Sequence, residues 1–542
     1  MSPPLIQNPP SATRQRWRSF CCPLHAIVGA FSPDRSTRPC ASAGAAPAEP
    51  VSLGDITPKQ RSSRCVLDTP ATDGLYEQLA PDRALVFRNA RVLTMRRDEV
   101  LDRHDVLVRN GVIEALQPTG LTLPPHAVTI DCTGKTLLPG LTEIHGHLTT
   151  STWAAVLGPC IRGGGDGGAY QLPYDLMLFQ LLAAGVTRLE IMAGCPDTLW
   201  MRDSVRAGQL AGPTMQVGSP MIDGAPVMQS PAMSYVVGDL EGGRRAGELI
   251  AELGYDFAKP YSNLPAEGYE GLMQVCERKG IRVMGHAPSQ VGIEAAIRRG
   301  QQGIAHAGEL FYNETGPQRT DPARLERLVR LMADSGTWLQ ATLVASQRLE
   351  WLGGRAPLVA PDLEHMNPLQ RALWAEDSPM LAVVRGKPEI GKYIDDVFRL
   401  SCKAAAAARQ AGVRVLTGTD FANPYIVEGQ SLHEELGYLV EKSGFSPIEA
   451  LQASTRLPAQ YHGEGPADGL VAVGGAARLL VLDADPLADI HATRRIDTVL
   501  AGTFLLRRQA RLDGLARVQR AFAAMPPAIV ALPQMAAPGA DA

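Results

Sequence analysis

The segment LLPGLTEIHGHLTT, residues 137 to 150, places two histidines two positions apart directly after an apolar run. Alternate side chains of a β-strand lie on one face, so His145 and His147 are expected to point the same way and to bind one metal ion. Neutral imidazole is the commonest metal ligand in proteins, and a strand supports it rigidly. The chain has eleven histidines, however, and such a pair also arises by chance. Alone, the pair is as consistent with two polar residues at a strand end as with a metal site.

Four further polar residues follow short apolar, β-branched runs later in the chain: Lys259, His286, His306 and Asp420. Helix-like segments precede the runs that carry the two histidines, and those segments end in glycine, as helices commonly do. The spacing fits one strand and one helix per unit, with short connections. The polar residues therefore fall repeatedly at the carboxyl ends of strands, where a (β/α)8 barrel forms its active site.

Taken together, the HxH pair after LPG and the later Lys, His, His and Asp resemble the metal-dependent amidohydrolase superfamily. Within it, the chain is most similar to the imidazolonepropionase-like branch, which includes Xaa-Pro dipeptidases and arginine carboxypeptidases. The resemblance covers roughly residues 84 to 508. It implies an α/β fold, a (β/α)8 TIM barrel with a small β-sandwich domain formed by N- and C-terminal strands.

The resemblance also implies a cofactor, two divalent metal ions expected to be Zn²⁺ and bridged by a carboxylated lysine. Glu143 is a departure, since relatives more often have aspartate two residues before the first histidine, and this leaves the orientation of the pair open. Zn, Mn and Co all suit such ligands. The implied ligands are His145, His147 and Asp420 for the buried ion, His286 and His306 for the outer ion, and carboxylated Lys259 for both.

The expected chemistry is hydrolysis of an amide C–N bond. Two bridged ions lower the pKa of bound water toward about 7, so that a metal-bridging hydroxide attacks the carbonyl. Asp420 takes the proton and passes it to the leaving amine. Tyr261 lies two residues after Lys259, on the same strand face, and either binds a substrate carbonyl or packs. The substrate is expected to be a small-molecule amide or dipeptide, hydrolysed by a dipeptidase, a carboxypeptidase or an N-acyl amino acid hydrolase.

Other functions stay open. One is a mononuclear enzyme that opens a cyclic amide, as imidazolonepropionase does, and another is hydrolysis of a lactone, another ester or a toxin amide. A non-catalytic, metal-stabilised binding module is the third. Arg162 and Arg202 are candidates for holding a substrate carboxylate, and His433, on a strongly helical segment, is expected to orient its helix. The remaining histidines have no partners in sequence and are interpreted as surface or packing residues: His104, His126, His365, His462 and His491.

Strand signals at both ends of the chain indicate the domain organisation. ALVFRNARVLTM and DVLVRNGVIEALQP are rich in β-forming residues around an Asn-Gly hairpin signal. The C-terminal segment GLVAVGGAARLLVLDADP predicts a second set of short strands that matches them. Within the barrel, GTWLQATLVAS, residues 336 to 346, predicts strand seven, and the long stretch 347 to 395 predicts a lid or a substrate-binding insertion. The expected regions are a disordered tail at 1–83, a composite β-sandwich from 84–138 and 466–515, the barrel at 139–465 and a Pro/Ala-rich tail at 516–542.

Composition narrows the choice of partners and compartment. A net charge of −4 gives no basic surface for nucleic acid. The nine cysteines include no CxxC pair and predict reduced thiols. No apolar stretch approaches the roughly 20 residues of a membrane span. A cytoplasmic protein is expected, with export as the alternative because a weak arginine-led apolar patch lies near the start. A homo-oligomer is left open.

Overall fold

The structure is a computed structural model that describes residues 72–148, 161–162, 174–227, 233–312, 321–352, 363–366, 368–373, 375, 388–421, 423, 425–525 and 529–530. The predicted disordered tail at 1–83 lies outside these residues as far as residue 71, and so does the candidate export patch. Much of the predicted lid at 347–395 and most of the C-terminal tail also lie outside them. Residues 72–83 are described and include a short strand, Glu77–Gln78, paired with Phe504 and Leu505.

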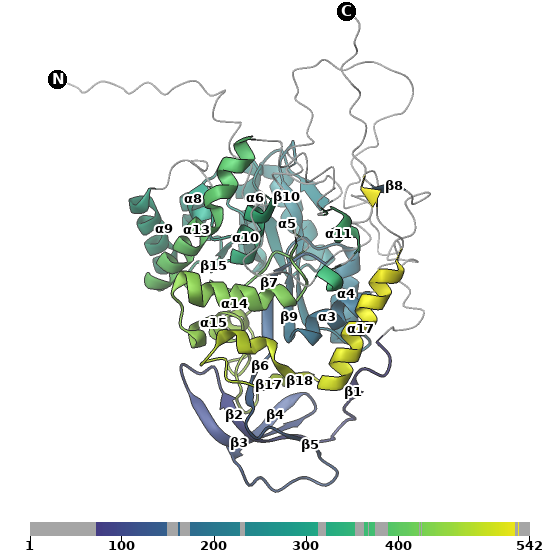
Figure 1. Ribbon diagram of the computed structural model, residues 1–542. Coiled ribbons are helices and arrows are strands. Elements are labelled where there is room, and N and C mark those ends of the chain that lie inside the picture. Colours follow the sequence, from purple (N-terminus) through teal and green to yellow (C-terminus); the bar gives the residue numbers. More distant parts are fainter. Residues whose placement is uncertain are drawn as a thin grey trace, which may run out of the picture.

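The described chain contains a parallel sheet that curls into a nearly closed eight-stranded barrel. Each neighbouring pair in it is parallel, as alternating strands and helices predict. The (β/α)8 barrel expected from the sequence is therefore present (Figure 1). Its strands in order are β7 (Leu141–Gly146), β9 (Val186–Ile191), β10 (Thr214–Asp223), β12 (Phe257–Pro260), β13 (Arg282–Gly285), β14 (Gly303–Ile304), β15 (Trp338–Gln340) and β16 (Val415–Leu416).

Backbone hydrogen bonds between the first strand and the segment after the last strand close the barrel. Ile144 N–H donates to the Thr417 carbonyl at 3.2 Å, and Asp420 N–H donates to the His145 carbonyl at 2.8 Å. Gly146 forms a parallel bridge with Phe421, and a Cβ on Gly146 would lie 2.4 Å from the Phe421 ring. The seam therefore brings the HxH segment directly against the segment that carries Asp420.

Strand seven is shorter than predicted. β15 ends at Gln340, and helix α10 (Leu343–Leu352) begins within the segment expected to be strand. Thr342 has a left-handed φ of 48°, which ends the extended backbone. The Glu435 carboxylate then accepts hydrogen bonds from the first helical N–H groups, those of Leu343 at 3.0 Å and Val344 at 2.8 Å. This acceptor comes from a distant helix and supplies the cap that the local sequence lacks.

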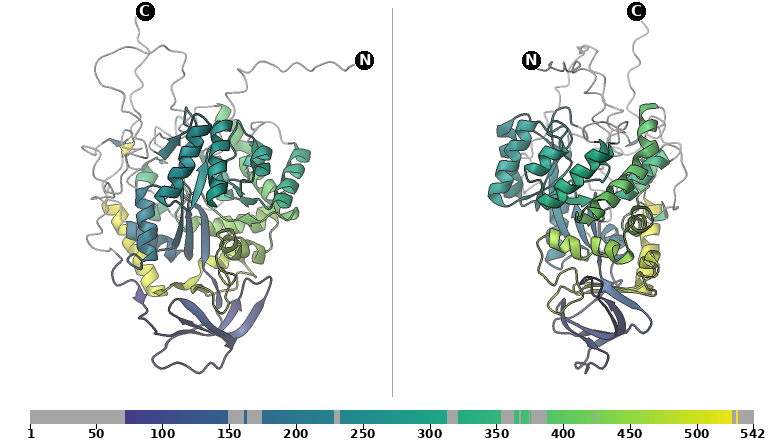
Figure 2. Two further views of the ribbon diagram at one scale, coloured as in Figure 1. Left: turned by 180° about the vertical axis from the view of Figure 1, so that it is seen from behind. Right: turned by 90° about the vertical axis from the view of Figure 1, so that its left-hand side faces the viewer.

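Helices between the strands cover the outside of the barrel (Figure 2). Their ends follow capping rules: Asp239 accepts from Gly242 N–H at 2.7 Å before one helix, and Gly280 ends the next in a left-handed conformation with φ 68°. The helices are α3 (Tyr174–Ala183), α4 (Pro196–Arg206), α5 (Leu240–Leu253), α6 (Ala266–Lys279), α7 (Ile293–Arg298), α8 (Glu309–Tyr312), α9 (Pro322–Ser335), α10, α11 (Pro368–Leu373), α13 (Pro388–Gln410), α14 (Gln430–Ser443), α15 (Pro447–Ala453), α16 (Arg456–Tyr461), and the 3-10 turns η6 (Leu363–His365) and η7 (Ile490–Arg494).

A second sheet at one end of the barrel combines strands from both ends of the chain (Figures 1 and 2). Asn110 and Gly111, at φ 51° and 73°, form the predicted hairpin turn between two of its strands. Its own apolar cluster is separate from the barrel core. The strands are β1 (Glu77–Gln78), β19 (Phe504–Arg507), β18 (Ile496–Ala501), β17 (Arg478–Leu482), β6 (Thr136–Pro139), β2 (Leu85–Leu93), β3 (Val100–Arg109), β4 (Val112–Pro118) and β5 (Val128–Asp131).

Helix α17 (Arg508–Ala524) continues the chain after the second sheet and packs along α3. A Cβ on Gly514 would lie 1.9 Å from the Phe179 ring, so the two helices approach closely there. This helix occupies the first part of the segment expected to be a Pro/Ala-rich tail. Two short strands, β8 (Ile161–Arg162) and β20 (Ile529–Val530), pair with each other, and β11 (Ser234–Val236) pairs with β10. Among the described residues, none of the helices has the length and apolar character that a membrane crossing requires.

Candidate metal centre

Four histidine rings from three strand ends gather at one end of the barrel. The His145 ring centroid lies 5.4 Å from that of His147 and 4.7 Å from that of His306. The His306 and His286 centroids are 4.9 Å apart. All four side chains are buried. The structure therefore brings together the histidines that the sequence places at separate strand ends.

Asp420 supplies a carboxylate to the same cluster. Its Oδ1 lies 3.1 Å from His147 Nε2 and 3.4 Å from His145 Nε2, and its Oδ2 lies 4.0 Å from His306 Nδ1. One donor atom from each of His145, His147 and Asp420 lies within 4.8 Å of the others, a grouping that could hold one metal ion. Asp420 and His306 both have left-handed backbones, with φ of 61° and 64°. Such strain in non-glycine residues concentrates at functional sites.

Electrostatics favour neutral imidazoles beside an ionised carboxylate. Burial, reinforced by Lys259, holds the pKa of His145 well below its usual range. Burial likewise lowers the pKa of His306 to about 4, against the opposing effect of Asp420. Burial opposes ionisation of Asp420, but the adjacent His145, His147 and His306 hold its pKa well below the ordinary value. Neutral imidazoles and a carboxylate are the protonation states that bind a divalent cation.

Lys259 reaches the cluster from β12 and is 1% exposed. Its side chain runs beside Gly285, where a Cβ would lie 2.9 Å from Lys259 Cδ and 2.7 Å from the Pro260 carbonyl oxygen. Glycine at this position leaves the path of the lysine open. Tyr261, two residues on, is also buried, and its ring packs edge-on against His286 with centroids 4.5 Å apart. The lysine Nζ lies 6.0 Å from the centre of the Tyr261 ring.

Two buried ring nitrogens fit a metal site. His147 Nδ1 and His306 Nε2 have no hydrogen-bond partner among the described residues. The other nitrogen of His306, Nδ1, bonds the Thr342 hydroxyl at 2.8 Å, which leaves Nε2 for a ligand. A buried polar atom without a partner is costly unless a ligand or an ion satisfies it. The donor set of imidazole and carboxylate is the set that zinc prefers.

Glu143 supports the seam rather than the cluster itself. Its carboxylate accepts from the backbone N–H of His145 at 2.9 Å, and from the Thr419 backbone N–H at 2.9 Å and hydroxyl at 2.7 Å. Burial raises the pKa of Glu143 to about 8 despite these bonds. Glu143 thus ties the backbone of His145 to Thr419, the residue before Asp420.

Sequence reasoning missed two neighbours of the cluster. Gln340 Oε1 lies 2.7 Å from His145 Nδ1, and Glu309 Oε1 lies 4.0 Å from His286 Nε2. Both side chains are buried. A signal for Gln340 existed, since it is the last residue of strand seven. Glu309 begins helix α8, three residues after His306.

Arg202, a candidate for holding a substrate carboxylate, has partners within the protein. Arg202 binds the Asp256 carboxylate at 2.9 Å and the Gly254 carbonyl at 2.7 Å, so its guanidinium is committed to structural partners. The side chain of Arg162 lies outside the described residues. His433 has the structural environment expected of it, because Nε2 donates to the Ala184 carbonyl at 3.1 Å and Nδ1 lies 3.0 Å from the Thr493 hydroxyl.

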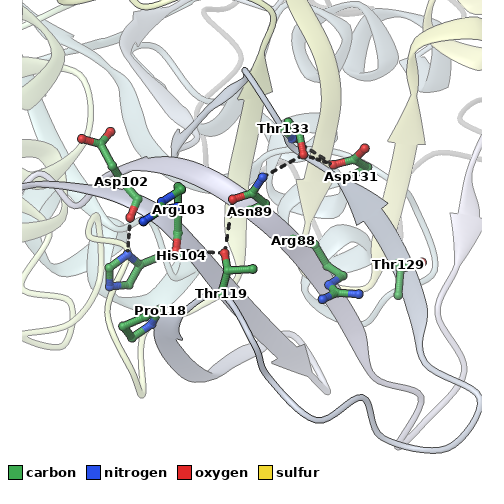
Figure 3. A pocket seen from close by; sticks show the side chains of 10 residues that line it. All are labelled: Arg88, Asn89, Asp102, Arg103, His104, Pro118, Thr119, Thr129, Asp131 and Thr133. Atoms are coloured by element: carbon green, nitrogen blue, oxygen red, sulfur yellow. Dashed lines mark hydrogen bonds between the residues drawn. The ribbon is translucent and has the colours of Figure 1, made fainter.

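A hollow on the second sheet is separate from the cluster (Figure 3). Thr119 donates there to the Arg103 carbonyl at 2.9 Å, and Asn89 donates to the Thr133 hydroxyl at 2.9 Å. Two arginines and two aspartates line it, so its formal charges balance. It contains no predicted site residue. The lining residues are Arg88, Asn89, Asp102, Arg103, His104, Pro118, Thr119, Thr129, Asp131 and Thr133.

Comparisons with known proteins agree with this geometry. The model of the amidohydrolase family matches residues 136–505. The chain is 24% identical to imidazolonepropionase of Klebsiella pneumoniae (strain 342) over 432 residues, which cover 75% of this chain and 93% of the relative.

Solved structures show the same fold. A Xaa-Pro dipeptidase crystallised with bound methionine superposes with a TM-score of 0.61 at 17% identity, covering 78% of this chain and all of that one. Bottromycin amidohydrolase superposes with a TM-score of 0.65 at 22% identity, covering 86% of this chain and 97% of that one. With the family match spanning most of the barrel and part of the second sheet, the chain belongs to the amidohydrolase family and is a hydrolase that acts on carbon–nitrogen bonds.

Proposed function

We propose that this hydrolase cleaves the amide bond of a dipeptide or an N-acyl amino acid, as a dipeptidase, a carboxypeptidase or an N-acyl amino acid hydrolase. The observation that carries the proposal is the convergence of four buried histidines, a buried lysine and a buried aspartate at the carboxyl ends of the barrel strands. That end of a (β/α)8 barrel holds the active site in essentially all characterised enzymes of this fold.

The cluster has donors for two ions. His145, His147 and Asp420 form the inner group, for which the close spacing of their donor atoms is the support. His286 and His306 form the outer group. Lys259 lies buried among them, and carboxylation would convert its ammonium into a bridging carboxylate. We assign Zn²⁺ as the metal because imidazole and carboxylate ligands suit it.

The residues of the chain have distinct tasks in the proposed reaction. Bound divalent ions would polarise the scissile carbonyl and activate a water molecule near neutral pH. The Asp420 carboxylate, which faces His145 and His147 in the cluster, accepts the proton of the attacking water and delivers it to the leaving nitrogen. Tyr261, whose ring packs on His286, donates its hydroxyl to the substrate carbonyl. Burial of the cluster excludes bulk water and strengthens these interactions.

A second candidate is a mononuclear enzyme that opens a cyclic amide. The alignment with imidazolonepropionase, which covers 93% of that protein, favours it. This candidate requires one ion per chain and an unmodified Lys259. Metal counting and crystallographic density for the added carboxylate on Lys259 separate the two.

The test is a substrate screen on purified protein supplied with zinc and bicarbonate. Libraries of dipeptides and N-acyl amino acids form one arm, and cyclic amides, lactones and other esters form the other. Zinc-dependent release of an amino acid from the first library supports the proposal. Turnover confined to the second arm, or no zinc-dependent turnover in either, contradicts it.

A further inference from the structure

A line of hydrogen-bonded side chains runs from the candidate metal centre into the interior of the barrel. His145 Nδ1 lies 2.7 Å from Gln340 Oε1, and Gln340 Nε2 lies 3.3 Å from Glu190 Oε1. Glu190 Oε2 lies 2.8 Å from His462 Nε2. Gln340 and Glu190 are 0% exposed, and the His462 side chain is 2% exposed. The line therefore joins strands one, seven and two with the segment that follows α16.

The far end of the line supplies a fixed negative charge. Glu190 Oε2 also lies 3.5 Å from the Arg282 guanidinium, which stacks on the Tyr461 ring at 4.5 Å. The Tyr461 ring in turn meets Trp338 edge-on, with centroids 5.4 Å apart. The Arg282 guanidinium and the His462 ring nitrogen therefore both face Glu190 Oε2, and Gln340 Nε2 faces Glu190 Oε1. Glu190 is therefore an acceptor at both oxygens.

The acceptor character of Glu190 sets the direction of every bond in the line. A carboxylate cannot donate, so the amide NH₂ of Gln340 faces Glu190, and its second hydrogen reaches the Ile144 carbonyl at 3.0 Å. The amide oxygen of Gln340 then faces His145 Nδ1. That ring nitrogen carries the hydrogen, and the His145 lone pair lies on Nε2, the nitrogen 3.4 Å from Asp420.

We propose that Gln340 is a positioning residue that fixes the Nδ1–H tautomer of His145, and that buried Glu190 holds Gln340 in the required orientation. The metal-binding part of this inference rests on the proposed function, because it makes Nε2 of His145 a ligand to the inner ion. The opposite orientation of Gln340 would set its oxygen against two acceptors, the Ile144 carbonyl and Glu190 Oε1. Gln340 and Glu190 therefore act together: Glu190 orients the Gln340 amide, and the amide sets the tautomer of His145.

Replacement of Gln340 by methionine tests the pair while filling a similar volume. Gln340→Met removes the acceptor for His145 Nδ1–H, and we expect zinc affinity, measured by competition with a chromogenic chelator, to fall by about 10- to 100-fold. Gln180→Met is the matched control, since Gln180 is equally buried and bonds a backbone carbonyl, that of Glu428, at 3.2 Å. Both variants lose a buried amide, but only the first should lose zinc affinity. Equal affinity in wild type and Gln340→Met overturns the proposal.

A residue swap provides the rescue. In Glu190→Gln combined with Gln340→Glu, the new carboxylate accepts from His145 Nδ1, and the new amide donates to that carboxylate while its oxygen accepts from His462. The order of donors and acceptors is restored, although the Ile144 carbonyl loses its donor. We expect the swap to recover zinc affinity to within a few-fold of wild type, whereas packing alone predicts no recovery. A swap that binds zinc as weakly as Gln340→Met overturns the proposal.

The tautomer itself can be measured without metal. Nitrogen-15 spectra of metal-free wild-type protein labelled at histidine report which ring nitrogen carries hydrogen, and the His145 signals are assigned by their loss in His145→Asn. The expected result is a protonated Nδ1 and an unprotonated Nε2. A protonated Nε2 overturns the proposal even if zinc binds. Failure of the wild type to bind zinc contradicts the proposed function instead, and leaves this tautomer measurement to decide the role of Gln340.

Discussion

His147 Nε2 lies 3.1 Å from Asp420 Oδ1, across the seam where the first barrel strand meets the segment after the last one. The backbone bond from Asp420 N–H to the His145 carbonyl lies in the same seam. Closure of the barrel and assembly of the candidate metal centre therefore depend on the same few residues. Substitutions at this seam should therefore change both the catalytic activity and the free energy of unfolding, to different extents.

Asp420→Asn should abolish most of the activity. The amide keeps the size of the side chain but cannot accept a proton from the attacking water, and it removes the charge that faces three histidines. We expect kcat/KM to fall by at least about 100-fold, the usual contribution of a general base. Steady-state kinetics at saturating zinc, together with metal content, check this result. A variant that keeps its metal and its full activity rules out the proposed role.

Gly285→Ala should displace Lys259. The new methyl group would lie 2.9 Å from Lys259 Cδ and 2.7 Å from the Pro260 carbonyl oxygen, so the lysine side chain and the backbone that follows it must both move. A displacement of about 1 Å at a catalytic centre can cost about 100-fold in kcat. Gly238→Ala is the control, because a Cβ there meets no atom within 4 Å. Similar kcat values for the two alanine variants would show that catalysis does not depend on the position of Lys259.

Arg348→Met should destabilise the fold. The Arg348 and Glu434 side chains are 0% and 4% exposed and lie 2.6 Å apart, so removal of the arginine leaves the buried carboxylate facing the more distant Arg494 guanidinium, 3.8 Å away. We expect the free energy of unfolding, from denaturant titration, to fall by about 3–5 kcal/mol. Arg298→Met, in an exposed pair with Glu294, should lose no more than about 0.5 kcal/mol. Adding Glu434→Leu to Arg348→Met should recover stability, and no recovery would contradict the ion-pair explanation.

His433 should make the protein sensitive to acid. Burial and the neighbouring Arg494 lower its pKa to about 3, against about 6.5 in an unfolded chain. Its stabilising contribution is complete above about pH 6.5 and is lost as the pH falls toward 3, by at most about 1.4 kcal/mol per pH unit. The slope of unfolding free energy against pH over this window should therefore be smaller in His433→Gln. The same substitution at exposed His491 is the control, and an unchanged slope in His433→Gln would contradict the prediction.

Local patterns predict the strand ends and what they carry. The HxH pair, Lys259 and Asp420 each follow a short apolar run, and one rule about barrel strand ends brings them to a common place. Asn110 and Gly111 predict their hairpin because both positions need a left-handed backbone. In such cases the information lies within a few residues.

Contacts across the barrel interior could not be predicted in the same way. Glu190, Gln340 and His462 meet only because strands two and seven face each other and the segment after α16 packs beneath them. The sequence predicts a surface or packing residue at His462, because nothing near it in sequence marks a partner. The start of α10 was missed for a similar reason, because Glu435, which caps it, lies far along the chain.

Zinc-edge anomalous diffraction from crystals grown with zinc and bicarbonate tests the central claim most directly. The account predicts two peaks inside the cluster, one at about 2.0–2.2 Å from donor atoms of His145, His147 and Asp420, and the other at similar distances from His286 and His306. Density for a carboxylated Lys259 should lie between the two peaks. Zinc bound elsewhere, or no peak among these side chains, would contradict the account.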